Sequence, residues 1–441
     1  MNIYFVSLGC DKNLVDSEMM IASLRKNGFV LVDDLNEADV IVVNTCCFIG
    51  DAKEESINTL IEMGSYKEGR CRLLVAAGCL AQRYHNEIKE DIPEVDLIVG
   101  TMGYEDLAGK IKEAIASDKV LESLKDIDYL PTPLIDRESM SGGYYAYLKI
   151  AEGCDKCCTY CVIPKVRGHY RSVPMENLIL QAKHLVKNGA KELILVAQET
   201  TLYGKDIYGE KSLPILLEEL SKIEDLKWIR ILYCYPEEIT DELIDAIKRL
   251  PKVCNYIDMP VQHGSDDVLR RMGRWTNRKQ IEETVAKLRK EIPDIAIRTT
   301  LITGFPGENE KDFEEVKEFV RKMEFERLGV FTYSREEDTP AAEMEEQLEE
   351  SVKEKRRDEI MQIQQDIAFE KSNSKVGEIY EVMIEGRLPD EGVYIARTYM
   401  DAPDVDGYVF IQSDYNLESG DFVKVEITRS DEYDLIGEII E

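Results

Sequence analysis

Short apolar runs alternate with amphipathic segments in the first quarter of the chain. Four of these runs predict strands: Ile3–Leu8, Val40–Val43, Leu73–Ala77 and Leu97–Val99. Four segments with apolar residues at helical spacing predict helices: Leu14–Lys26, Ala52–Tyr66, Gln82–Glu90 and Tyr104–Ile115. Strands that alternate with helices predict a parallel sheet with helices on its faces. We therefore expect an α/β domain over residues 1–117.

This periodicity is lost over residues 118–143, where Pro131, Pro133 and a Ser-Gly-Gly sequence predict an extended linker. Six further apolar runs predict strands: Tyr145–Ile150, Glu192–Ala197, Trp228–Leu232, Tyr256–Met259, Ile295–Thr303 and Leu328–Tyr333. The segments between them predict helices, for example Met175–Lys187, Thr240–Leu250, Arg278–Glu291 and Glu310–Met323. Six strand–helix units are two fewer than a closed eight-stranded barrel contains. The prediction is an open (βα)6 partial TIM-like barrel, which with one further helix occupies residues 144–372.

The last part of the chain changes pattern again. Residues 343–370 are rich in charge and repeat apolar residues at helical spacing, which predicts a solvated helix that braces the domains. Five short runs beyond it predict strands: Glu378–Glu385, Val393–Tyr399, Tyr408–Gln412, Phe422–Ile427 and Asp434–Glu438. Five strands in so short a segment predict a small closed β-barrel over residues 373–441. The predicted fold class is thus α/β multidomain, with a parallel sheet domain, a partial barrel and a five-stranded β-barrel.

Composition narrows the class of protein. The chain has 441 residues, of which 44% are hydrophobic and 32% charged, as in ordinary globular proteins. No run of eighteen apolar residues is present, so we expect a cytoplasmic protein without a membrane span. Eleven cysteines are too few for a disulfide scaffold in a chain of this length and suit metal ligation in a reducing compartment. The net charge of −32 argues against a general nucleic-acid binder and favours a basic partner.

Three cysteines form a compact motif just after the first strand of the predicted barrel. Cys154, Cys158 and Cys161 have the spacing Cys-x3-Cys-x2-Cys. Cubane four-iron clusters normally take four cysteines, so three would leave one iron open, which is typical of a reactive site. A zinc knuckle is the alternative, because Cys157 creates two adjacent Cys-x2-Cys pairs. Zinc sites usually separate such pairs by a loop of about a dozen residues, and none is present here.

Three other cysteines follow three successive strands of the N-terminal domain. Cys10, Cys46 and Cys79 each come just beyond the carboxyl end of a predicted strand. In open α/β sheets that edge is where ligands bind, so three thiols could converge on a second metal centre there. The alternative is that they are buried apolar residues, as free cysteines often are. Cys47 competes with Cys46 for the ligand position, whereas four further thiols fit no such position and predict packing or surface roles: Cys71, Cys157, Cys234 and Cys254.

Polar loops also follow the strands of the central domain. They comprise residues 198–201, 262–265 and 304–308. Glycines at the end of a strand allow backbone to approach a ligand closely. An ordinary turn is the alternative for residues 304–307. The sequence gives His263 no carboxylate or cysteine partner, so we do not assign it as a catalytic base.

Residues 151–168, with the sequence AEGCDKCCTYCVIPKVRG, resemble the signature of the radical S-adenosylmethionine (SAM) enzymes. VSLGCDKNLVDSE (6–18), NTCCFIGDAKEESI (44–57) and AAGCLAQRY (76–84) resemble the N-terminal domain of the methylthiotransferases within that class. The resemblance implies two 4Fe-4S clusters. Cys154, Cys158 and Cys161 would hold the radical SAM cluster, and Cys10, Cys46 and Cys79 an auxiliary cluster. It also implies a SAM pocket, for which we select Tyr160, Gln198, Glu199, Arg298, Gly304 and Gly307.

The C-terminal segment resembles a TRAM domain, an oligonucleotide-binding-like barrel found in RNA-modifying relatives. Its residues 376–441 include seventeen acidic and four basic residues, a net charge of −13 that would repel a phosphate backbone. In this acidic charge and in the sequences DAKEESI and MPVQHGSD, the chain resembles the methylthiotransferase branch that modifies small-subunit ribosomal protein twelve. Resemblance to that branch implies that the substrate is a basic ribosomal protein, either free or assembled in the small subunit. A tRNA substrate is not expected. A tRNA adenosine methylthiotransferase and a non-catalytic metal-binding scaffold on the ribosome remain as alternatives.

In that branch the β-carbon of an aspartate receives a methylthio group. One SAM supplies the methyl group to sulfur at the auxiliary cluster, and a second SAM supplies the radical that removes hydrogen from the aspartate. A reductant such as flavodoxin or ferredoxin is implied as electron donor. No side chain is required as a catalytic acid or base, because the cofactors carry the chemistry.

Overall fold

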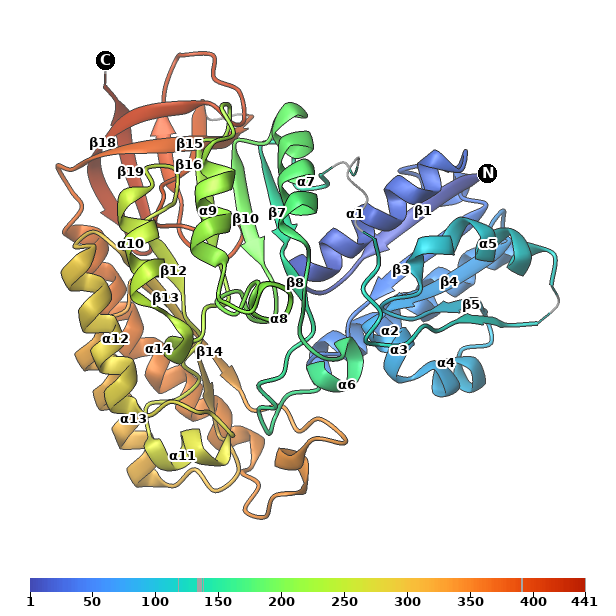
Figure 1. Ribbon diagram of the computed structural model, residues 1–441, viewed down its shortest axis with the longest axis horizontal. Coiled ribbons are helices and arrows are strands. Elements are labelled where there is room, and N and C mark those ends of the chain that lie inside the picture. The colour runs from blue at the N-terminus through green and yellow to red at the C-terminus, as the bar shows by residue number, and fades with distance from the viewer. Residues whose placement is uncertain (118, 133–136, 138, 390–391, 441) are drawn as a thin grey trace.

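The computed structural model describes residues 1–117, 119–132, 137, 139–389 and 392–440. Its N-terminal domain is a six-stranded parallel sheet in the order β2-β1-β3-β4-β5-β6. The strands are β1 (Asn2–Ser7), β2 (Val30–Leu31), β3 (Val40–Thr45), β4 (Leu73–Gly78), β5 (Val95–Val99) and β6 (Leu121–Ser123). The helices are α1 (Asp11–Lys26), α2 (Gly50–Gly64), α3 (Cys79–Arg83), α4 (His85–Asp91) and α5 (Leu107–Ile115). The domain occupies the right of Figure 1.

All four predicted strands of this sheet are confirmed, and two further strands were missed. β2 has two residues and β6 three, too few to show a period. β6 pairs in parallel with β5 and lies in the segment expected to be only an extended linker. That expectation was therefore wrong at Leu121–Ser123, where the chain adds an edge strand before it leaves the sheet. Asp118 and Pro133, also assigned to the linker, lie outside the described residues.

The central domain contains the six predicted strands: β7 (Tyr145–Lys149), β10 (Glu192–Val196), β11 (Trp228–Ile231), β12 (Tyr256–Asp258), β13 (Ala296–Thr303) and β14 (Arg327–Thr332). They form two three-stranded parallel sheets, β7-β10-β11 and β12-β13-β14. Backbone hydrogen bonds such as that from Cys254 N to Ile229 O (2.9 Å) join the region before β12 to β11. Within the described ranges no pairing joins β14 back to β7, so the arc is open. This agrees with the predicted partial barrel.

Helices cover the outer face of this arc (Figure 1). They are α7 (Met175–Lys187), α9 (Leu213–Ser221), α10 (Asp241–Arg249), α12 (Arg278–Glu291) and α13 (Glu310–Met323), with the shorter α8 (Lys205–Tyr208) and α11 (Asp266–Arg271) in the loops. Alternate strand residues such as Leu193 and Leu195 join the core beneath the helices. Ile194 and Val196 belong to a separate cluster on the inner face of the arc. Each strand therefore presents one set of side chains to the helices and the other to the interior.

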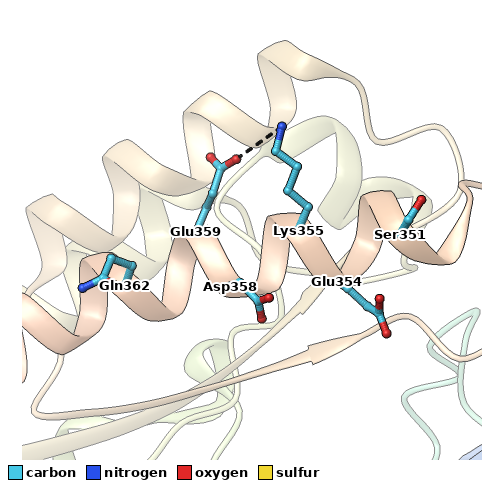
Figure 2. Close-up of a pocket in the computed structure, with 6 residues that line it drawn as sticks. All are labelled: Ser351, Glu354, Lys355, Asp358, Glu359 and Gln362. Carbon is cyan, nitrogen blue, oxygen red and sulfur yellow. Dashed lines mark ion pairs between the residues drawn. The ribbon is translucent and has the colours of Figure 1, made fainter.

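A long helix, α14 (Glu350–Asn373), packs against α13, β13 and β14 and ends at the C-terminal barrel. The helix was expected from residue 343, but residues Pro340–Glu343 form a 3-10 turn and α14 begins seven residues later. Figure 2 shows that its outer face forms a shallow hollow lined by charged and polar side chains: Ser351, Glu354, Lys355, Asp358, Glu359 and Gln362. α14 is thus a brace with one solvated face. In the part of the chain with described placement, every helix is too short or too polar to cross a membrane.

The C-terminal segment forms the predicted closed five-stranded barrel, in the order β15-β16-β17-β19-β18. Its strands are β15 (Ile379–Leu388), β16 (Val393–Arg397), β17 (Val409–Gln412), β18 (Phe422–Asp431) and β19 (Asp434–Ile439). Met383, Met400 and Ala402 of this segment pack on Trp228 and Tyr256, the first residues of β11 and β12. The barrel therefore covers the amino ends of the central strands. Three of its counted acidic residues, Asp390, Glu391 and Glu441, lie outside the described residues.

Candidate active site

Cys154, Cys158 and Cys161 lie together on the loop between β8 (Ala151–Glu152) and α6 (Ile163–Arg167). Cys154 N donates to Gly168 O at 3.1 Å, and Cys161 N donates to Cys158 O at 3.0 Å. These bonds fold the loop back on itself and hold the three cysteines on one short stretch. Burial raises the pKa of Cys154 to about 12, so without a metal this thiol keeps its proton. Iron would stabilise the thiolate, as metal ligation requires.

The second trio is assembled from three separate loops. Cys10 caps α1, Cys46 follows β3, and Cys79 is the first residue of α3 after β4. The backbone of Gly9 (φ +86°) passes so close to Cys46 that a β-carbon on Gly9 would lie 2.7 Å from that of Cys46. Burial first, and the neighbouring Cys10 among smaller effects, raises the pKa of both Cys46 and Cys79. The parallel sheet thus brings the three predicted thiols to one edge.

Cys47 occupies different surroundings from Cys46. It is fully buried and belongs to the apolar cluster beneath the sheet, together with Leu80 and Ile88. Burial raises its pKa to about 12. Among the described residues no three His, Cys, Asp or Glu side chains converge closely enough to hold a single metal ion, whereas the ligands of a cubane bind separate irons and stand further apart.

A buried ionic network lies between the two trios. Arg167, the last residue of α6, is 2.6 Å from Asp16 of α1 and 3.1 Å from Glu152 of β8. Lys149 of β7 pairs with the same two carboxylates. Burial opposes ionisation of Glu152, but Lys149 and Arg167 together hold its pKa well below the usual range. Two cations and two anions therefore neutralise one another at the junction of the two domains.

Arg167 also reaches the sheet trio itself. Its second terminal nitrogen lies 3.3 Å from Cys79 Sγ and 2.5 Å from Asn13 Oδ1. Arg167 was not predicted as a site residue, although it lies six residues after Cys161. The missing information is tertiary, because Asp16 and Cys79 are far from Arg167 along the chain and only domain docking brings them together.

Gln198 and Glu199, two predicted SAM contacts, lie at the carboxyl end of β10. Gln198 Nε2 donates to Glu152 Oε1 at 3.0 Å, and its own Oε1 is buried without a partner. Glu199 is fully buried, and this burial raises its pKa to about 7. One oxygen accepts from Thr201 N at 2.9 Å, and Oε2 has no partner. Both side chains therefore present an unused acceptor.

On the other side of the cysteine loop, Tyr160 packs edge-on against Phe305, with ring centroids 6.4 Å apart. Arg274, which sequence reasoning missed, stacks 4.2 Å over the ring of Tyr235. It donates to a backbone carbonyl through one nitrogen, while Nε and Nη1 are buried without partners. The Tyr235 hydroxyl in turn lies 3.9 Å from Cys158 Sγ. Arg274 thus brings an unsatisfied cation beside the cysteine loop.

Gly304 and Gly307 follow β13 as predicted, but their loop is filled by the protein itself. A β-carbon on Gly304 (φ +73°) would collide with Lys353 of α14. The amides of Gly304 and Phe305 both donate to the carboxylate of Glu308, at 2.8 and 3.2 Å. Glycine is required here by the left-handed backbone and by the close approach of α14. The same Glu308 lies 3.5 Å from His263 Nε2, a partner that the sequence did not reveal.

Arg298 lies apart from the loop of Gly304 and Gly307. It lies near the start of β13, where it pairs with Asp258 at 3.1 Å and with Asp406 of the C-terminal barrel at 3.4 Å. Six residues of extended strand, about 20 Å, separate Arg298 from Gly304. Asp406 belongs to the C-terminal barrel, whereas Asp258 ends β12 and also accepts from Tyr233 N in the loop after β11, at 3.0 Å. The pair with Asp406 favours a docking role for Arg298, and its predicted place in the SAM pocket beside Gln198 and Glu199 stays untested.

Comparison with known proteins matches three parts of the chain. Residues 148–320 match the radical SAM superfamily, residues 376–440 the TRAM domain, and residues 2–100 the uncharacterized protein family UPF0004. A protein of Lachnoclostridium phytofermentans named ribosomal protein uS12 methylthiotransferase RimO is 59% identical over 438 residues, covering 99% of each chain. The protein of the same name from Acetivibrio thermocellus is 51% identical and covers 99% of this chain and 97% of its own.

Two solved structures share the fold. The radical SAM methyltransferase TsrM from Kitasatospora setae superposes with a TM-score of 0.56 at 13% identity, covering 89% of this chain and 80% of TsrM. The cobalamin-dependent radical SAM enzyme OxsB gives a TM-score of 0.52 at 14% identity. This chain covers 54% of OxsB, so it spans about half the length of that protein. At these identities the likeness concerns the fold alone.

Proposed function

The chain belongs to the ribosomal protein uS12 methylthiotransferases, a family of radical SAM enzymes, and we propose that it adds a methylthio group to the β-carbon of an aspartate in uS12. The observation that carries this assignment is 59% identity over 99% of both chains. SAM and a 4Fe-4S cluster are its cofactors. The residues that hold them, the auxiliary cluster and the electron donor are our proposals.

We assign Cys154, Cys158 and Cys161 to the radical SAM cluster. The unused polar atoms around this loop fit SAM, which offers an ammonium, a carboxylate and ribose hydroxyls. Gln198 Oε1 and Glu199 Oε2 are buried acceptors without partners. Because a buried unpaired polar group is costly, these atoms indicate a polar ligand. Arg274 would add two donors for its carboxylate.

We assign Cys10, Cys46 and Cys79 to the auxiliary cluster. Support comes from the convergence of their loops at one sheet edge and from Arg167, whose guanidinium lies 3.3 Å from Cys79 Sγ and would donate to a thiolate there. Cys46 is preferred to Cys47 because it lies against Gly9, the residue before Cys10: a β-carbon on Gly9 would be 2.7 Å from that of Cys46.

When bound, the cofactors supply the radical chemistry and the methyl group. The chain's own residues orient the groups that react. The ionic network of Arg167, Lys149, Asp16 and Glu152 fixes the sheet domain against the arc, and thereby the two trios against each other. Holding reactants in such a fixed geometry is the main contribution that protein makes in cofactor enzymes.

Substrate preference is supported by charge. The net charge of −32, and of −13 over residues 376–441, suits a basic ribosomal protein and disfavours tRNA. We place the reaction in the cytoplasm, with a small electron-transfer protein such as flavodoxin or ferredoxin as reductant.

The test is incubation of the reconstituted enzyme, SAM and a reductant with purified uS12 and with tRNA in parallel. Mass spectrometry should find the methylthio group on an aspartate of uS12 and leave tRNA unmodified. Modification of tRNA adenosine with uS12 unchanged would favour the tRNA branch. Absence of deoxyadenosine formation under reducing conditions would support the non-catalytic scaffold.

A further inference from the structure

The loop after β11 contacts Cys158 on one side and the residue next to Cys10 on the other. Tyr235 lies 3.9 Å from Cys158 Sγ on the radical SAM side. Two residues earlier, the Tyr233 hydroxyl lies 3.3 Å from Asp11 Oδ1, and Asp11 directly follows Cys10. A carbon that loses hydrogen at one centre and gains sulfur at the other must lie within reach of both. This loop therefore borders the position of the target carbon.

Tyr233 is held in an uncommon conformation. Its φ is +60°, in the left-handed region that side chains with a β-carbon rarely adopt. Its amide donates to Asp258 Oδ2 at 3.0 Å, which fixes this turn. Such strained residues concentrate at functional sites, where the surrounding structure imposes them.

Lys12 lies against this tyrosine. Its ammonium is 3.3 Å from the centroid of the Tyr233 ring, and its side chain is 9% exposed. Lys12 occupies the first turn of α1, where the helix dipole disfavours a cation. Its ammonium pairs with Asp11 Oδ1 at 2.8 Å and also interacts with the Tyr233 side chain. An ammonium has three donors, so Lys12 keeps hydrogen-bonding capacity for a further acceptor.

The other cations near the trios are engaged or placed elsewhere. Arg167 and Lys149 share Asp16 and Glu152, and Arg298 is paired with both Asp258 and Asp406. Arg274 has free donors but lies beside Cys158, on the side assigned to SAM. Among the described residues, Lys12 is the cation that lies both near Cys10 and against the loop after β11.

We propose that Lys12 binds the carboxylate of the substrate aspartate and so selects aspartate as the residue modified. The inference rests on the proposed function, in which the reacting β-carbon carries that carboxylate. An ammonium that holds the carboxylate would fix the β-carbon one bond away, beside Cys10. Asp11 keeps the ammonium oriented in the free enzyme, and Tyr233 supplies an aromatic face that tolerates the cation.

The test compares uS12 carrying aspartate at the modified position with uS12 carrying asparagine there, for wild type, Lys12→Met and Lys12→Gln. Wild type should bind the aspartate protein about 10-fold more tightly and turn it over about 100-fold more efficiently, since hydrogen bonds to charged groups contribute on this scale. Both variants should lose this preference, to within about 3-fold, because neither side chain carries charge. The loss should appear in Kd as well as in kcat/KM.

Lys26→Met is the matched control, because Lys26 is exposed in the last turn of the same helix and should leave both preferences unchanged. Iron content and the midpoint of thermal unfolding show whether a variant has folded. If Lys12→Met or Lys12→Gln has not folded, the remaining one of the two tests the proposal. A Lys12 variant that keeps the preference for aspartate would overturn the proposal. Failure of the proposed function would instead appear as wild type that leaves uS12 unmodified, and the binding comparison would still decide the role of Lys12.

Discussion

The two cysteine trios differ in how the chain builds them. Cys154, Cys158 and Cys161 occupy eight consecutive residues on one loop, closed by backbone hydrogen bonds within the loop and to Gly168. Cys10, Cys46 and Cys79 come from three loops, and only the parallel order β1-β3-β4 makes them neighbours. A local site depends on a few short-range bonds. A distributed site depends on the stability of a whole domain and on how that domain docks.

The surroundings of the two trios differ accordingly. Aromatic rings and the partly unsatisfied Arg274 lie beside the loop trio, which suits binding of a polar cofactor. The sheet trio has the saturated ionic network of Arg167 behind it, which suits fixed placement. We infer that the loop side is built to receive a ligand, whereas the sheet side is built to hold its position.

Replacing one cysteine in each trio should give the largest effects and should distinguish the functions of the two trios. Reconstituted wild type should contain about eight irons per chain, from two four-iron clusters. Cys154→Ala should lose half of this iron and all reductive SAM cleavage, because the open iron that binds SAM is lost with its cluster. Cys10→Ala should also lose half of the iron but retain cleavage, while losing methylthiolation. Iron analysis and deoxyadenosine quantification measure both effects.

Cys71→Ala serves as the control for these variants, because Cys71 is a buried thiol outside both trios and should keep full iron and activity. Full iron content in Cys10→Ala would contradict the auxiliary cluster. Tetrahedral zinc in anaerobically purified wild type, bound at Cys154, Cys158 and Cys161, would contradict the loop trio as well.

Arg167→Met should show how far the sheet trio depends on docking. The substitution removes one of two cations from a buried group with two carboxylates, and breaking a buried ion pair on one side costs about 3–5 kcal/mol. We expect a matching loss of stability at the domain junction, measured by denaturant unfolding and by faster proteolysis between the domains. Lys165→Met on the same helix removes an exposed cation and should cost less than about 1 kcal/mol. Equal stability of the two variants would contradict a docking role for Arg167.

Much of the fold could be predicted because its elements are long enough to show a period. The six central strands and the five barrel strands are all present, and α7, α12 and α13 have the predicted bounds. The misses include β2, β6 and β8, and the one helix predicted over Gln82–Glu90 is instead α3 and α4, which meet at Tyr84. β2 and β6 are too short for a periodic pattern, and the charged segment before Glu350 resembles a helix in composition although the chain forms a turn there.

Site residues, too, could be predicted only where a pattern along the chain marks them. The loop trio is a local motif. The strand-end rule indicated only that Cys10, Cys46 and Cys79 could converge, and the family resemblance supplied their role as ligands. Arg167, Arg274 and Lys12 could not be found, because their partners are distant in sequence and a single basic residue carries no pattern. Arg298 was assigned to the SAM pocket because its strand leads into residues 304–308, whereas its pair with Asp406 favours a role at the barrel.

Substitution of Arg298 should have the smallest effect on SAM binding, and it tests directly whether this residue lines the SAM pocket or docks the barrel. Its pair with Asp406 joins the arc to the C-terminal barrel, and its pair with Asp258 joins β13 to β12. Arg298→Met should therefore change the Kd for SAM less than about 2-fold and instead loosen the barrel, which limited proteolysis before residue 379 would detect. Arg274→Met, with two unpartnered nitrogens beside the cysteine loop, should weaken SAM binding about 10- to 100-fold, the range for hydrogen bonds to a charged group. If the two variants exchanged these effects, the SAM pocket would extend toward the barrel, and the separation between the ligand-binding end and the docking end of the arc would fail.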